Sequence, residues 1–111
     1  MKFRSVVDNH DNASRVMLAE GDLNKEHFNA LCEWLAAECR NKQVVLSLTK
    51  VEIMTSQLLE MINQIVNFLT ITGNEVIICD VNPATAAIVT NFTDGINFKT
   101  ARDFKHAVTL F

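Results

Sequence analysis

The chain opens with side chains that alternate between two sets. Phe3, Ser5 and Val7 fall on one side, and Lys2, Arg4 and Val6 fall on the other. A period of two is typical of a β-strand. A turn cluster over residues 9–12 follows, and residues 14–19 are expected to form a second strand. The pattern therefore predicts a hairpin at the start of the fold.

The spacing of apolar residues changes after Gly21-Asp22-Leu23-Asn24. Apolar side chains then recur every three or four residues, which predicts an amphipathic helix with Phe28, Leu31, Cys32, Leu35 and Cys39 on its apolar face. We expect Asn24 to cap this helix, with Glu26 near the positive end of its dipole. Residues 41–42 are expected to end it.

The middle of the chain predicts a central strand followed by a long helix. Residues 43–48 form a nearly continuous apolar run, which is typical of a strand buried on both faces. After an irregular link over residues 49–54, a helix is expected from Thr55 or Ser56 to Thr72, with Gly73 as its terminator. Its buried stripe is predicted to hold Leu58, Ile62, Ile65, Val66 and Leu69.

The last third of the chain continues the alternation of strand and helix. Residues 76–79 predict another buried strand, and Asn82-Pro83 is a typical start for a short helix over residues 84–91. Residues 96–99 predict an edge strand, and residues 101–110 predict a final helix. The element order β, β, α, β, α, β, α, β, α predicts an α/β fold, an open mixed β-sheet of about four to five strands covered by about four helices.

Composition narrows the class of protein. With 111 residues, the chain is expected to form a single domain over residues 1–111. Its net charge of −3 comes without a block of Lys or Arg, which argues against nucleic acids and anionic membrane surfaces as partners. No apolar run approaches the roughly 20 residues of a membrane span, and the chain shows no secretory signal. We therefore expect no membrane insertion and a cytoplasmic location, which the three unpaired cysteines also fit.

Residues with the chemistry of catalysis or metal binding are scattered. The three histidines and three cysteines lack the spacing of metal ligands, and the cysteines are expected in the core. The sequence contains no Gly-rich phosphate loop and no nucleophile elbow. We therefore expect no enzyme activity and no cofactor or metal. Asp80, at the end of a predicted strand, is a candidate for closing a turn or for binding a small ligand.

Three stretches, taken in order, resemble the STAS domain family of sulfate transporters and anti-sigma-factor antagonists. Residues 21–24 resemble its Gly-acidic-Leu-Asp turn, and residues 73–83 resemble its next turn, strand and proline-initiated helix. Residues 48–56 resemble the link from the central strand to the second helix, which places Ser56 in register with the family's regulatory serine. The chain departs from the family where Ser47 replaces a common strand-end Asp and Thr55 replaces the Asp that usually precedes the serine. The resemblance covers the whole chain.

The resemblance implies a phosphorylation-controlled, protein-binding switch of the anti-sigma-factor-antagonist type. The form with unphosphorylated Ser56 would bind a protein partner, and a serine kinase, often the anti-sigma or bait protein itself, would release it. A serine phosphatase would reset the switch, whose output is transcription or another process such as biofilm control. We expect a monomer or weak dimer. The candidate partner-binding residues are Met54, Thr55, Ser56, Gln57, Glu60, Asn82 and Thr85, with residues 21–24 on the same rim.

Other interpretations remain open from the sequence. Ser56 also suits a capping hydroxyl at the start of a helix, and Thr55 fits a cap better than a phosphorylation site. Single-domain proteins of this kind also serve as non-catalytic subunits of lipid-transport ABC complexes. A third interpretation is a small-ligand binder or small enzyme that uses a pocket near Asp80.

Overall fold

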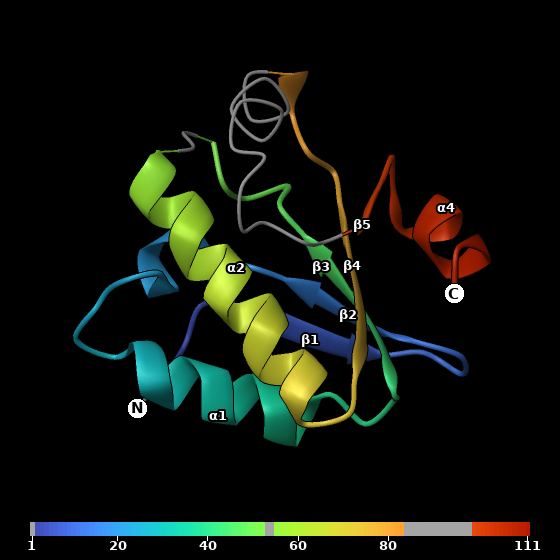
Figure 1. Ribbon diagram of the computed structural model, residues 1–111, viewed down its shortest axis with the longest axis horizontal. Helices are drawn as coiled ribbons and strands as arrows, with labels where there is room; N and C mark the ends of the chain where they lie inside the picture. Colours follow the sequence, from blue (N-terminus) through green and yellow to red (C-terminus); the bar gives the residue numbers. More distant parts are fainter. Residues whose placement is uncertain (1, 53–54, 84–98) are drawn as a thin grey trace.

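The computed structural model describes residues 2–52, 55–83 and 99–111 (Figure 1). One sheet contains the five strands β1 (Val6–Asn9), β2 (Ser14–Met17), β3 (Gln43–Ser47), β4 (Glu75–Cys79) and β5 (Lys99–Ala101). The α-helices are α1 (Phe28–Glu38), α2 (Ser56–Ile71) and α4 (Phe104–Thr109), and a 3-10 turn, η1 (Glu20–Asp22), precedes α1. Among these described helices, none is both long and apolar enough to cross a bilayer.

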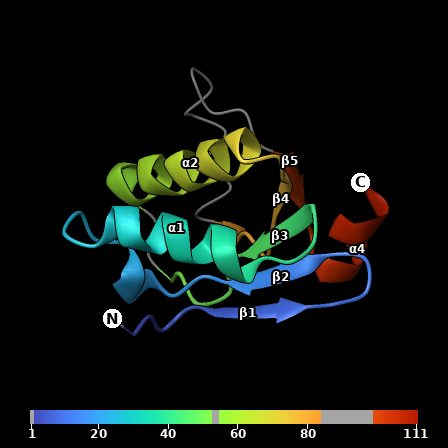
Figure 2. The same cartoon turned by 90° about the horizontal axis from the view of Figure 1, so that it is seen from below.

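The strands lie in the sheet in their chain order. β1 runs antiparallel to β2 and forms the predicted hairpin, while β2, β3, β4 and β5 are mutually parallel. Parallel neighbours need a crossover connection, and α1 and α2 supply two of them on the same face of the sheet (Figure 2). The predicted mixed α/β sheet is confirmed. The helix predicted over residues 84–91 lies outside the described residues.

The central strand β3 is buried on both faces, as its apolar run predicts. Val44 and Leu46 face the larger core beneath α1 and α2, whereas Val45 faces a smaller cluster beneath α4. The larger core holds the apolar stripes of both long helices, including Leu31 and Leu35 of α1. Burial of this apolar surface is the main force that fixes the two helices on the sheet.

The two ends of α2 explain why this helix was predictable. Thr55 is the N-cap, and its Oγ1 accepts a hydrogen bond from the backbone N–H of Leu58 at 3.1 Å. At the other end, Gly73 has a φ of 101°, and the N–H of Asn74 donates to the carbonyl of Leu69 at 2.9 Å. This closure is a Schellman motif, in which glycine takes the left-handed conformation without a steric penalty.

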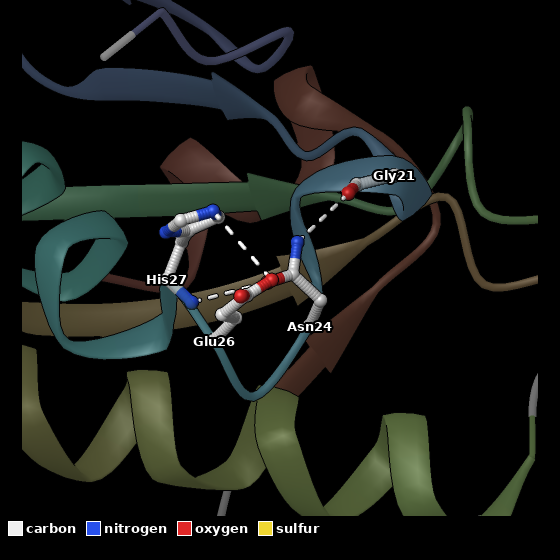
Figure 3. A network of polar contacts seen from close by, with 4 residues as sticks. All are labelled: Gly21, Asn24, Glu26 and His27. Atoms are coloured by element: carbon white, nitrogen blue, oxygen red, sulfur yellow. Dashed lines mark hydrogen bonds and ion pairs between the residues drawn. The ribbon is translucent and has the colours of Figure 1, made fainter.

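The start of α1 differs from the prediction. The helix begins at Phe28 instead of directly after Asn24, and its N-cap is His27. The Asn24 side chain closes a separate turn (Figure 3): its Oδ1 accepts from the N–H of His27 at 3.1 Å, and its Nδ2 donates to the carbonyl of Gly21 at 3.2 Å. Asparagine thus stabilises a turn that competes with the first turn of the helix.

Three further element boundaries also differ. α1 ends at Glu38 rather than at residues 41–42, and the Asn41 side chain instead bonds the carbonyl of His10. α4 begins at Phe104, because Asp103 caps it through the N–H of His106 at 2.8 Å and residues 99–101 pair with β4. The edge strand therefore spans Lys99–Ala101, and residues 96–98 of the prediction lie outside the described residues.

Candidate regulatory site at the carboxyl end of the sheet

The carboxyl ends of the parallel strands meet at one edge of the sheet. Met17 at the end of β2 pairs with Ser47 at the end of β3, which in turn pairs with Cys79 at the end of β4. The segments that leave these strands, including the link from β3 to α2, therefore share one rim. Binding surfaces of open α/β folds lie at this edge.

Ser56 is the first residue of α2 and stands on this rim. Its side chain is exposed, and it makes no hydrogen bond with any residue in the described part of the chain. The capping role that the sequence allowed for Ser56 belongs to Thr55, as predicted for that residue. The Ser56 hydroxyl is thus left available to solvent at the positive end of a helix dipole.

Ser56 differs from every other serine of the chain, which contains four. Ser5, Ser14 and Ser47 have exposed fractions of 4%, 0% and 0%. All four lie within the described residues, so Ser56 is the one serine hydroxyl that an enzyme can reach without unfolding the protein. This difference in accessibility is a property of the fold that the sequence did not reveal.

A hollow of about 350 Å³ lies between the starts of α1 and α2. Two of the predicted partner-binding residues, Gln57 and Glu60, line it together with Met61. Phe28 lines it from the start of α1, and Lys25 lines it from the segment that precedes this helix. Sequence reasoning missed Lys25 and Phe28, although two successive crossovers on one face bring both helix starts to the same edge.

Of the remaining predicted contact residues, the structure describes Asn82 and Thr55. Asn82 is half-buried, and its Nδ2 donates to the carbonyl of Glu52 at 3.4 Å, which ties the segment after β4 to the link before Ser56. Thr55 is exposed beside Ser56. Met54 and Thr85 lie outside the described residues.

A partly buried polar cluster, in which Ser47 and Cys79 are buried and Thr49 is exposed, lies beneath this rim. The hydroxyl of Ser47 donates to Oδ2 of Asp80 at 2.6 Å, and its oxygen lies within hydrogen-bond distance, 2.8 Å, of Oγ1 of Thr49. The Cys79 thiol also donates to Asp80, at 3.1 Å. Asp80 is the one non-glycine residue with a positive φ, 60°, among the described residues.

The ionisation of this cluster follows from its contacts. Burial raises the pKa of Asp80, but the hydrogen bonds from Ser47, Cys79 and Thr49 and the charge of Arg15 outweigh burial and lower it overall. For Cys79, burial and the adjacent carboxylate raise the pKa to about 12. The cluster therefore holds an ionised Asp80 and a neutral thiol at neutral pH.

Comparison with known proteins gives a fold but no close relative. No family model matches the chain, and no curated protein matches it significantly. Among solved structures, a serine-to-glutamate variant of RsbS from Moorella thermoacetica matches with a TM-score of 0.73 and 16% identity, covering 97% of this chain and 94% of that one. This chain has the STAS fold.

Two other structures with the STAS fold agree. A chain of the stressosome, described as a signal integration and transduction hub, matches with a TM-score of 0.75 and 17% identity, over 95% of this chain and 94% of that one. A candidate anti-sigma-factor antagonist from Thermotoga maritima matches with a TM-score of 0.73 and 17% identity, over 96% of this chain and 92% of that one. The fold predicted from the resemblance is thereby confirmed.

Within residues 21–24, Asp22 has a structural role that the sequence did not predict. Asp22 is buried, and its carboxylate accepts hydrogen bonds from the backbone N–H groups of Arg4 and Ser5. It therefore anchors the N-terminal segment. Gly21 and Asn24 line a separate hollow of about 380 Å³, which they share with Lys2 and other residues of the N-terminal segment.

The cysteines are buried, as expected. Burial raises the pKa of Cys32 and of Cys39 to about 11, with a further contribution from the neighbouring glutamate in each case. Within residues 2–52, 55–83 and 99–111, His, Cys, Asp and Glu form no group of three or more that could hold a metal ion.

Proposed function

We propose that this protein is a phosphorylation-controlled switch that binds another protein when Ser56 is unmodified and releases it when Ser56 is phosphorylated. The observation that carries the proposal is the contrast among the four serines: three are buried and Ser56 is exposed at the start of α2. The hollow lined by Gln57 and Glu60 beside it offers a docking surface for the partner. The likeness in fold to an RsbS variant and to a stressosome chain supports a role in signalling.

The protein itself should tolerate a phosphate on Ser56. At the N-terminus of α2 the helix dipole favours negative charge by about 0.3–1 kcal/mol. Glu60 lies four residues later on the same helix face, and its like charge opposes this gain by roughly 0.2–0.5 kcal/mol. The two effects are small and of opposite sign, so the folded state is expected to change little in stability.

A partner that covers Ser56 is affected far more. It would have to bury a phosphate carrying about −1.5 to −2 charges at neutral pH, beside the existing charge of Glu60. An unmatched charge in a buried interface costs several kcal/mol, and each 1.4 kcal/mol is a factor of ten in affinity. Phosphorylation is therefore expected to lower the affinity of the complex by roughly a hundredfold or more. Its main effect is on partner binding and not on the stability of the fold.

The enzymes proposed to act on the switch are those that the resemblance to the STAS family implies. We propose that an ATP-dependent serine kinase, of the anti-sigma or bait type, adds the phosphate to Ser56. A metal-dependent serine phosphatase is proposed to remove it. The chain itself is proposed to act without catalysis, in the cytoplasm, as a monomer or weak dimer. We also propose that the docking surface includes Met54, Thr55, Asn82 and Thr85. The process that the switch controls is proposed to be transcription or biofilm formation.

The decisive experiment combines phosphorylation with binding. The protein is incubated with its cognate kinase and ATP, and intact and peptide masses locate the phosphate, which is expected on Ser56. In a pull-down, the Ser56→Ala variant should retain the partner, whereas Ser56→Asp should lose it. Equal retention by the two variants, or a phosphate on another residue alone, would rule out the switch.

A further inference from the structure

The link that leads to Ser56 is attached to the neighbouring strand by side chains. Asp80 follows β4, and its carboxylate accepts the Ser47 hydroxyl at 2.6 Å. Thr49, the second residue after β3, joins the same chain of hydrogen bonds through Ser47. Three residues further along, the carbonyl of Glu52 accepts from Asn82. The link is thus held at two points by residues that follow β4.

The backbone at Asp80 indicates that its side chain is needed there. A φ of 60° is sterically unfavourable for a residue with a Cβ, and glycine adopts it freely. The conformation is fixed on the backbone side by the Asp80 N–H, which donates to the carbonyl of Arg102 at 3.2 Å before α4. In this conformation the Asp80 carboxylate accepts hydrogen bonds from Ser47 at 2.6 Å and from Cys79 at 3.1 Å, and these bonds offset the backbone strain.

The burial of Ser47 strengthens its hydrogen bond to Asp80. Ser47 has an exposed fraction of 0%, so its hydroxyl has no access to water as an alternative partner. A charged acceptor forms shorter and stronger hydrogen bonds than a neutral one, which agrees with the 2.6 Å separation between Ser47 and Asp80. The carboxylate therefore fixes the orientation of the Ser47 hydroxyl, whose oxygen is also in contact with Oγ1 of Thr49 at 2.8 Å.

We propose that Asp80 is a positioning residue for the switch: by holding Ser47 and Thr49 it fixes the path of residues 48–52 after β3 and thereby the presentation of Ser56 to its kinase and partner. This inference rests on the proposed function. Asp80, the residue that follows β4, thus places a carboxylate next to Ser47 at the end of β3.

Two variants separate the contribution of the Asp80 side chain from that of its backbone conformation. Asp80→Gly removes the carboxylate and relieves the backbone strain, while Asp80→Asn keeps an oxygen acceptor and tolerates the left-handed conformation. Ser47→Ala breaks the same chain without altering the backbone at Asp80. Ser14→Ala is a matched control, because Ser14 is also buried, strand-borne and hydrogen-bonded, but lies at the start of β2, away from the rim.

Two measurements test the proposal. Amide hydrogen exchange over residues 48–52 and 55 should accelerate about tenfold or more in Asp80→Gly and Ser47→Ala, relative to the exchange of β3, and stay near wild type in Asp80→Asn and Ser14→Ala. Phosphorylation kinetics at Ser56 should show a several-fold higher KM for the first two variants, and Asp80→Asn should retain most of the activity.

The outcomes distinguish this inference from the proposed function. Unchanged exchange and unchanged KM in both Asp80→Gly and Ser47→Ala would overturn the role of Asp80, even if wild-type Ser56 is phosphorylated normally. Equal acceleration in Ser14→Ala would overturn it as well, because the effect would then be general loss of stability. If the kinase fails to modify wild-type Ser56, the proposed function falls, and the exchange measurement still decides whether Asp80 holds the link.

Discussion

Ser5 donates both its backbone N–H and its hydroxyl to Oδ2 of Asp22, each at 2.7 Å. Both residues are buried, and the same Ser5 hydroxyl accepts the backbone N–H of Ala19 at 2.9 Å. The N-terminal segment and η1 are therefore joined by a buried network centred on the carboxylate of Asp22. This explains why the paired part of β1 begins only at Val6 although the alternation starts earlier: the preceding N–H groups bond to Asp22.

Replacing Asp22 by alanine should destabilise the fold strongly. The change leaves the buried N–H and hydroxyl of Ser5 without an acceptor, and we expect a loss of about 2–4 kcal/mol in the free energy of unfolding. Urea denaturation followed by the fluorescence of Trp34 measures it directly, because the Trp34 ring packs against Phe3 of the N-terminal segment, with the ring centroids 5.2 Å apart. Asp8→Ala, on the exposed side of β1, is the control and should stay within about 0.5 kcal/mol of wild type.

The cap of α2 gives a second prediction. Thr55→Ala removes the oxygen that accepts the Leu58 N–H, and a lost N-cap costs about 0.5–2 kcal/mol of stability. Thr55→Ser keeps the oxygen and should restore most of it. Chemical denaturation of the two variants gives the comparison, and identical stability of Thr55→Ala and wild type would show that the cap contributes nothing.

The thiols should be nearly inert in the folded protein. The pKa values of Cys32 and Cys39 are raised to about 11 and that of Cys79 to about 12, so the reactive thiolate is scarcer than in an ordinary thiol at pH 8. Iodoacetamide at that pH should leave the native protein unlabelled and should label three sites after unfolding in urea. Mass spectrometry counts the adducts, and rapid native labelling would contradict the burial of the thiols.

Asp80 predicts how stability changes in acid. Its pKa in the folded protein lies below the ordinary value of 3.8, so its interactions stabilise the fold fully above the unfolded-state pKa and less as pH falls through the folded-state pKa. Asp80→Asn lacks this dependence, and the difference in unfolding free energy between it and wild type should shrink below about pH 4. Urea titrations at several pH values test this, and a difference that is constant from pH 7 to pH 3 would refute it.

Local patterns predicted the long elements well. The stripe of α2, its cap at Thr55 and its terminator Gly73 are all local signals, and the structure places the helix within one residue of the predicted limits. The start of α1 was wrong because Asn24 has two possible local bonding patterns, as a helix cap or as a turn, and the sequence does not state which has the lower free energy.

The site was predictable only in part, because it depends on contacts between distant segments. Ser56 follows from the register of the resemblance, but its exposure relative to the other serines depends on which strand faces are covered. The bond between Ser47 and Asp80 joins residues 33 positions apart and depends on the pairing of β3 with β4. The predictions for Met54 and Thr85 stay predictions, since they concern residues outside the described part.

The burial of all three cysteines has a practical consequence for studying this protein in solution. A single cysteine introduced at the far end of α2, as in Ile71→Cys, would be the one thiol accessible to a fluorescent dye, since Ile71 is 84% exposed. Helix geometry places that position about 22 Å from Ser56, at 1.5 Å per residue. A dye there can report the arrival of a partner by energy transfer without obstructing it.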